Sequence, residues 1–161
     1  MPLLSLDDCL IWAAALRRAN KAIVFTTGVF DLLHPGHVHY LQAARAEGDA
    51  LMVAVQSDRV VRAARGPTRP INSAADRAEL LSALDCVDAV VVFDDTTADA
   101  IISTIHPDVL VTGAGPAAGA IAWRNTVEAP GGRVVGIAVE PGWSSSAMIE
   151  KIREREDSGK G

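Results

Sequence analysis

The 161-residue sequence has few aromatic residues, few cysteines and no long hydrophobic run. Aromatic side chains make up 4% of the chain, so Val, Ile, Leu and Ala must fill the interior. Cys9 and Cys86 are far apart and form no Cys-x-x-Cys or Cys/His cluster, which predicts two reduced thiols in a cytoplasmic protein. The longest apolar runs, 50–55 and 89–93, are too short to cross a bilayer, and the N-terminus lacks a signal-peptide pattern. We therefore expect no membrane partner.

Positive charge is scarce as well. The chain has 15 Lys and Arg against 20 Asp and Glu, which gives a net charge of −5. A nucleic-acid surface needs a basic stripe, so this charge argues against a nucleic-acid partner. A nucleotide can still bind, because that requires only local hydrogen-bond donors. The length fits one domain spanning 1–161, and the apolar fraction of 49% is ordinary for a globular protein.

Short apolar runs alternate with amphipathic segments along the chain. The apolar runs predict strands at 22–26, 51–55, 87–93, 108–112 and 133–139, with helices between them. An N-terminal helix is expected within 1–20, where Ser5 and Asp8 form a variant capping box. A last helix is expected from Ser144, with a frayed tail over 157–161. Because continuously apolar strands pair in parallel and are covered on both faces, we predict a single α/β domain: a doubly wound (Rossmann-like) five-stranded parallel sheet with helices on both faces.

Two histidines follow the first predicted strand, on either side of a glycine. Proline has a fixed φ and no N–H, so Pro35 suits the first position of a helix and places His34 just outside it. His37 then lies in the first turn, and Gly36 lets a ligand approach the backbone. Two imidazoles and free N–H groups at a positive helix end form an anion site suited to phosphate. A lone histidine here would be read as a cap or a surface residue, and two histidines without a third ligand make a poor zinc site, so no metal ligands are predicted.

Ligands of doubly wound sheets bind beyond the carboxyl ends of the strands, where the strand order reverses. This rule selects the loops after Thr26, Val55, Thr112 and Val139. The arginine-rich stretch 59–70 is expected to be a mobile basic loop.

The segment 28–37, with the sequence GVFDLLHPGH, resembles the signature of the cytidylyltransferase-like nucleotidyltransferases. Over about 22–152 the chain is similar to bacterial D-glycero-β-D-manno-heptose 1-phosphate adenylyltransferases. The resemblance implies transfer of AMP from ATP to a sugar 1-phosphate, with Mg²⁺ present and pyrophosphate released, by a homodimer. An acceptor phosphate is already ionised at pH 7, so positioning and electrostatics suffice and no general base is needed.

The resemblance also assigns roles to individual residues. It implies that His34 and His37 contact the triphosphate and stabilise the α-phosphorus during in-line displacement. Arg65 would neutralise the departing pyrophosphate, and Arg77 would reach the phosphates or the acceptor. Each arginine could instead be a solvated surface charge. The other nucleotide-binding residues it implies are Thr26, Thr27, Gly28, Phe30, Asp31, Gly36, Arg69, Gly113 and, from a turn matching Ser-Thr-Thr, Ser144, Ser145 and Ser146.

Two segments depart from the family pattern. Residues 112–116 read TGAGP where relatives commonly have a Lys-Gly-Gly-Asp-Tyr-like segment, and 26–28 read TTG where relatives favour Thr-Asn-Gly. The lost side chains predict an altered acceptor or weaker activity. Trp143 would pack against a base or sugar, or serve as a helix staple. Three hypotheses stay open: a sugar-phosphate adenylyltransferase, a cytidylyltransferase acting on a polyol phosphate such as glycerol 3-phosphate, and a nucleotide-binding protein with weakened catalysis.

Overall fold

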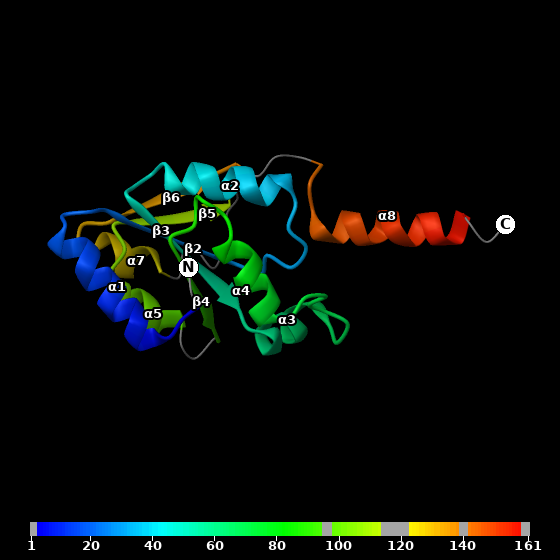
Figure 1. The fold of residues 1–161 in the computed structure, drawn as a ribbon, viewed down its shortest axis with the longest axis horizontal. Coiled ribbons are helices and arrows are strands. Elements are labelled where there is room, and N and C mark those ends of the chain that lie inside the picture. Colours follow the sequence, from blue (N-terminus) through cyan, green and yellow to red (C-terminus); the bar gives the residue numbers. More distant parts are fainter. Residues whose placement is uncertain (1–2, 95–97, 114–122, 139–141, 159–161) are drawn as a thin grey trace.

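Strands and helices alternate along the chain in the computed structural model, which describes residues 3–94, 98–113, 123–138 and 142–158 (Figure 1). In chain order the elements are β1 (Leu3–Leu4), α1 (Leu6–Arg18), β2 (Ile23–Gly28), α2 (Pro35–Arg45), β3 (Ala50–Gln56), α3 (Asp58–Arg65), α4 (Ala74–Ser82), β4 (Ala89–Phe93), α5 (Ala98–Ile105), β5 (Val109–Gly113), α7 (Arg124–Glu128), β6 (Arg133–Ile137) and α8 (Ser145–Ser158). The predicted α/β class, with a parallel sheet and helices, is confirmed.

The sheet has six strands in the order β1-β4-β3-β2-β5-β6, and each neighbouring pair is parallel. The prediction of five strands was therefore wrong. The additional strand is β1, whose residues Leu3 and Leu4 pair with Val90 and Val91 at the edge of the sheet. Two residues are too few to show a periodic pattern, so this strand is defined only by its partner.

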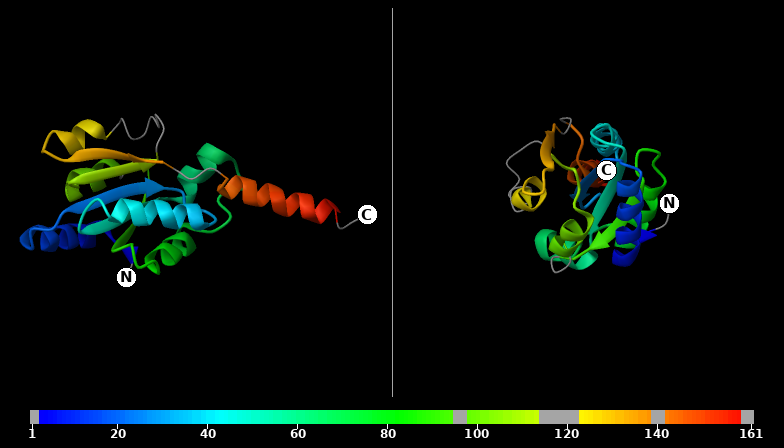
Figure 2. Two further views of the ribbon diagram at one scale, coloured as in Figure 1. Left: turned by 90° about the horizontal axis from the view of Figure 1, so that it is seen from above. Right: turned by 90° about the vertical axis from the view of Figure 1, so that its left-hand side faces the viewer.

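Alternate residues of each strand point to opposite faces of the sheet, and each face has its own core. On one face, Phe25 and Met52 pack with buried residues of α1, α5 and α7. On the other face, Val24 and Leu51 pack with buried residues of α2 and α4. The two views of Figure 2 show these helices as layers on either side of the strands. The central strands are thus buried from both sides, which explains their continuously apolar sequences.

The helix ends depart from the predicted ones in two places. More than half of the stretch expected to be a mobile basic loop is α3, which Ser57 caps by accepting a hydrogen bond from the Val60 N–H at 3.4 Å. Helix α8 continues through Ser158, two residues into the expected frayed tail, and extends away from the sheet (Figure 1). No helix within the described ranges is long and apolar enough to cross a membrane.

The order of the strands reverses beside β2. From β2 the chain proceeds to β3 and β4 on one side, and then returns to β5 on the other side. β2 pairs with β5 in a register that sets Thr26 opposite Val111. The carboxyl ends of β2 and β5 therefore meet at the switch point, which is where a doubly wound sheet holds its ligand.

Candidate active site

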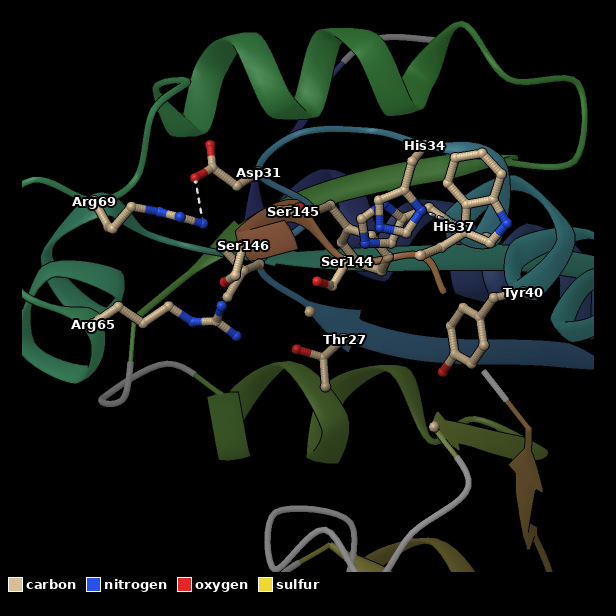
Figure 3. Close-up of a pocket in the computed structure, with 16 residues that line it drawn as sticks. Thr27, Asp31, His34, His37, Tyr40, Arg65, Arg69, Ser144, Ser145 and Ser146 are labelled. Atoms are coloured by element: carbon tan, nitrogen blue, oxygen red, sulfur yellow. Dashed lines mark hydrogen bonds and ion pairs between the residues drawn. The ribbon is translucent and has the colours of Figure 1, made fainter. Parts of the chain in front are cut away.

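A cavity of about 290 Å³ lies at this switch point (Figure 3). All the site residues expected from the sequence line it, except Thr26 and Arg77. They come from the β2–α2 connection, from α3 and the loop after it, from the end of β5, and from the start of α8. The full lining is Thr27, Gly28, Val29, Phe30, Asp31, His34, Gly36, His37, Tyr40, Arg65, Arg69, Gly113, Trp143, Ser144, Ser145 and Ser146.

His34 occupies the N-cap of α2, as the neighbouring proline predicted. Its backbone is extended, with φ −144° and ψ 165°, and Pro35 is the first residue of the helix. The His34 Nδ1 accepts a hydrogen bond from the His37 backbone N–H at 3.3 Å. With Nδ1 acting as the acceptor, the neutral ring carries its proton on Nε2, which remains a donor.

His37 is stacked on His34, and its pKa is lowered further than that of His34. The two rings are stacked, with centroids 3.8 Å apart and planes inclined by 17°. Burial and the nearby His34 lower the pKa of His37 to about 4, and burial also lowers the pKa of His34. The His37 Nδ1 is buried and has no hydrogen-bond partner among the described residues. Both rings are therefore neutral near pH 7.

Phe30 and Gly28 shape the loop that leads to these histidines. Phe30 is a non-glycine residue in the left-handed region, with φ +50°, and its buried ring meets His37 edge-on at 5.4 Å. A Cβ on Gly28 would lie 2.8 Å from that ring, so a side chain there would displace Phe30. Strained backbone of this kind persists where surrounding contacts hold it, often at binding sites.

Trp143 covers the histidine pair from the segment just before α8. Its ring is stacked on His34, with centroids 6.0 Å apart and planes inclined by 22°. Gly36 lies beneath: a Cβ there would come within 2.9 Å of the Trp143 Cβ and 3.1 Å of the His34 ring. The missing side chain of Gly36 thus allows the beginnings of α2 and α8 to meet.

Asp31 holds Arg69 against the cavity wall. Its carboxylate is 2% exposed and accepts hydrogen bonds from the backbone N–H groups of Ile71 and Asn72 at 2.9 Å each. Arg69 Nη2 lies 3.1 Å from Asp31 Oδ2. The Nε atom of Arg69 is buried and has no hydrogen-bond acceptor in the described part of the chain. Asp31 therefore fixes the guanidinium of Arg69 in the lining of the cavity.

Arg65 and the three serines supply the remaining polar lining. Arg65, at the end of α3, is exposed and points toward Ser146 in Figure 3. The Ser144 Oγ caps α8 by accepting from the Ala147 N–H at 3.0 Å, and the Ser145 Oγ donates to the Leu32 carbonyl at 3.1 Å. The second bond ties the start of α8 to the histidine loop. Two helix N-termini, two arginines and two neutral imidazoles thus surround one cavity, an arrangement suited to a polyphosphate.

Arg77 does not reach the cavity, in contrast to the role the resemblance implied. Its side chain is fully buried and donates to the carbonyls of Asn72 at 3.0 Å, Val29 at 2.6 Å and Gln56 at 2.8 Å. It also pairs with Asp58 at 2.7 Å. These partners occupy every edge of the guanidinium, so Arg77 braces the loops after β2 and β3 instead of meeting a ligand.

Thr26 also lies behind the cavity wall, and Tyr40 is a lining residue that the sequence reasoning missed. Thr26 Oγ1 donates to the Val111 carbonyl at 2.9 Å and lies 2.8 Å from the Tyr40 hydroxyl. This network joins β2, β5 and α2 at the switch point. Tyr40 follows His37 by three residues, and that helical spacing would have placed it on the same face. In the departing segment 112–116, Thr112 and Gly113 end β5 and the other three residues lie outside the described ranges.

Curated relatives share much of this sequence. The chain is 46% identical over 143 residues to the "Bifunctional protein HldE" of Syntrophotalea carbinolica, covering 89% of this chain and 29% of that protein. The protein of the same name from Citrifermentans bemidjiense is 48% identical over 146 residues, covering 90% and 30%. The chain therefore spans about 30% of the length of these curated relatives.

Solved structures share the fold. The lipopolysaccharide core biosynthesis protein from Thermoplasma volcanium matches 74% of this chain and 97% of its own, with a TM-score of 0.62 and 28% identity. Pantoate-beta-alanine ligase from Francisella tularensis matches 83% and 65% with the same TM-score of 0.62, and at 14% identity it supports the fold alone. The family model described as cytidylyltransferase-like matches residues 25–159, which include every residue that lines the cavity. The chain belongs to the cytidylyltransferase-like family.

Proposed function

We propose that the chain transfers AMP from ATP to a sugar 1-phosphate such as D-glycero-β-D-manno-heptose 1-phosphate, with release of pyrophosphate. The observation that carries this proposal is the stacked pair of His34 and His37 at the start of α2, in a cavity shared with Arg65, Arg69 and the start of α8. The 42–48% identity to proteins named HldE supports it. The choice of a heptose 1-phosphate as the acceptor rests on the similarity of the sequence to heptose 1-phosphate adenylyltransferases.

The proposed reaction is an in-line displacement at the α-phosphorus. An ionised oxygen of the acceptor phosphate forms the new bond, while the bond to the bridging oxygen breaks and pyrophosphate leaves with its electron pair. His34 donates through Nε2, and His37 donates through the ring nitrogen that carries its proton, to the oxygens on which negative charge builds up. Arg65 and the start of α8 neutralise the pyrophosphate.

Magnesium enters this proposal with the substrate, as MgATP. Asp31 is the acidic residue in the cavity lining, and its carboxylate is already engaged by two backbone N–H groups and Arg69. Within the described ranges no group of three or more His, Cys, Asp or Glu side chains is placed to hold a metal ion. Mg²⁺ is commonly bound through substrate phosphates, whose oxygens would hold it here and whose charge it would partly neutralise. The homodimer implied by the resemblance and the cytoplasmic location inferred from the two cysteines belong to the same proposal.

A product assay tests the proposal directly. The purified chain is incubated with MgATP or MgCTP and with either the heptose 1-phosphate or glycerol 3-phosphate, and pyrophosphate release is followed as phosphate in an assay coupled to inorganic pyrophosphatase. We expect release only with ATP and the heptose 1-phosphate. Turnover of CTP with glycerol 3-phosphate would replace the proposal with a cytidylyltransferase. Nucleotide binding by calorimetry without pyrophosphate release from any pair would indicate a nucleotide-binding protein that lacks turnover.

A further inference from the structure

A second cavity, of about 500 Å³, adjoins the first one on the side of α8. Its walls are the loop after α3, which contributes Arg69 and Ile71, and one face of α8. Arg69 and Ser146 line both cavities, so the two share a boundary. Figures 1 and 2 both show the start of α8 beside the loop that follows α3.

The α8 wall of this cavity carries acidic, basic and apolar side chains. Ser146, Ile149, Glu150, Arg153 and Glu154 recur at intervals of three and four residues, so they share one helix face. Neither the two glutamates nor Arg153 forms an ion pair within the described ranges, although their spacing would allow one. Carboxylates accept hydrogen bonds from hydroxyl groups, a guanidinium donates to hydroxyl oxygens, and Ile71 and Ile149 offer an apolar surface. This set of groups matches a polyhydroxylated ring.

Arg69 marks where a phosphate attached to such a ring would lie. Its side chain is 13% exposed, its Nη2 is ion-paired with Asp31 at 3.1 Å, and its Nε has no hydrogen-bond acceptor in the described residues. Arg69 lines both cavities, and a guanidinium at a cavity wall matches the charge and the hydrogen-bond geometry of a phosphate. Because Arg69 stands at the shared boundary, a phosphate there borders the first cavity.

We propose that the second cavity binds the carbohydrate part of the phosphorylated acceptor. The acceptor phosphate lies at Arg69 and Ser146, directed toward the α-phosphorus in the first cavity. The sugar extends along α8, where Glu150 and Glu154 accept from its hydroxyls and Arg153 donates to them. This inference rests on the proposed function and adds the location and the polyhydroxylated character of the acceptor site.

Steady-state kinetics with variants of α8 test the inference. We expect R153Q and the double variant E150Q/E154Q each to raise the KM for the heptose 1-phosphate roughly tenfold or more, while the KM for ATP stays within about twofold. R155Q is the matched control, because Arg155 is two residues further along α8, lies outside the cavity lining and is exposed. It should keep the wild-type KM for both substrates. Circular dichroism confirms that each variant is folded.

A shortened acceptor sharpens the test. β-D-Mannose 1-phosphate lacks one carbon and one hydroxyl of the heptose. The α8 variants should therefore raise the KM for mannose 1-phosphate by a smaller factor than the KM for the heptose 1-phosphate. Equal KM values for the heptose 1-phosphate in R153Q, E150Q/E154Q and R155Q, with an active wild-type enzyme, would overturn this inference and leave the proposed function intact. Absence of pyrophosphate release in the wild-type protein would instead contradict the proposed function.

Saturation-transfer NMR with the heptose 1-phosphate then tests acceptor binding without turnover. Unchanged binding in E150Q/E154Q would overturn the inference.

Discussion

The imidazole rings of His34 and His37 lie face to face, with their centroids 3.8 Å apart. Two protonated rings at this separation would repel each other, and burial adds to the cost of charging them. The free protein therefore holds two neutral rings, and a negative charge in the cavity is what makes protonation favourable. When a polyphosphate binds, the two rings can donate hydrogen bonds to it and can also take up a proton.

The low pKa of His37 predicts a pH-dependent stability. Its pKa is about 4 in the folded protein, against an ordinary value of 6.5. Between these values the unfolded chain binds more protons, so the free energy of unfolding falls as the pH is lowered through this window. The contribution of neutral His37 is complete above pH 6.5 and lost near pH 4. Urea unfolding at several pH values should show that the free energy of unfolding depends less steeply on pH in H37N than in the wild-type protein. The same pH dependence in both proteins would contradict the low pKa of His37.

The same pair predicts proton uptake when ATP binds. The phosphates bring negative charge beside His37, which raises its pKa toward neutrality. NMR titration of the ring protons should place the midpoint near pH 4 in the free protein and higher with a non-hydrolysable ATP analogue. A midpoint that stays unchanged on binding would mean that the phosphates lie away from this ring.

Removing either imidazole should reduce catalysis far more than it affects folding. H34N and H37N each take away a donor aimed at the reacting phosphate, and we expect kcat/KM to fall about 10²–10³-fold. Asparagine is a favourable N-cap residue, so H34N keeps α2 capped. H39N is the control, since His39 lies on the same helix, is exposed and lies outside the cavity lining. Equal losses in all three variants would show that the effect comes from the helix.

Arg77 should matter for stability. R77M leaves the Asp58 carboxylate and three carbonyls without their buried donor, which we expect to cost about 3–5 kcal/mol in the free energy of unfolding. The control is R62M, because Arg62 also faces Asp58, at 3.8 Å, but is exposed and should contribute little. Denaturant unfolding measures both. An R77M protein with wild-type stability and no activity would show that Arg77 takes part in the reaction.

Gly36 is expected to tolerate no side chain. In G36A the new methyl group meets the Trp143 Cβ at 2.9 Å, so the start of α2 and the segment before α8 must separate. We expect kcat/KM to fall at least about tenfold through loss of positioning. G36A/W143A keeps the opposing Cβ and should remain impaired, whereas G36A/W143G should recover part of the loss relative to W143G. Wild-type activity in G36A would show that the two helix starts need not touch.

Local features of this protein were predictable from the sequence. The extended His34, the helix beginning at Pro35 and the close approach at Gly36 follow from the geometry of proline and glycine, which depends little on distant residues. Five strands were predictable because each contains a run of apolar residues. Helix α3 was missed because its arginines obscured the pattern, while its buried residues are only Val60 and Val61.

Features that depend on packing between distant segments were not predictable. Arg77 resembles any charged residue on a helix, and its burial is determined by carbonyls from three other segments, at Val29, Gln56 and Asn72. Asp31 was expected at the site, but its contact with Arg69 requires the fold of the loop 66–72. Sequence alone identifies which residues are polar; the tertiary structure decides which partners are already satisfied.

The two-residue strand β1 also bears on aggregation. β4 has the sequence AVVVF, a run with high β-propensity and no charge, and without β1 its outer backbone N–H and C=O groups would form an open edge. Leu3 and Leu4 occupy part of this edge and are too few to template further pairing. An expression tag or a deletion that displaced them would expose β4 to pairing between molecules, so loss of solubility would precede any loss of the nucleotide site.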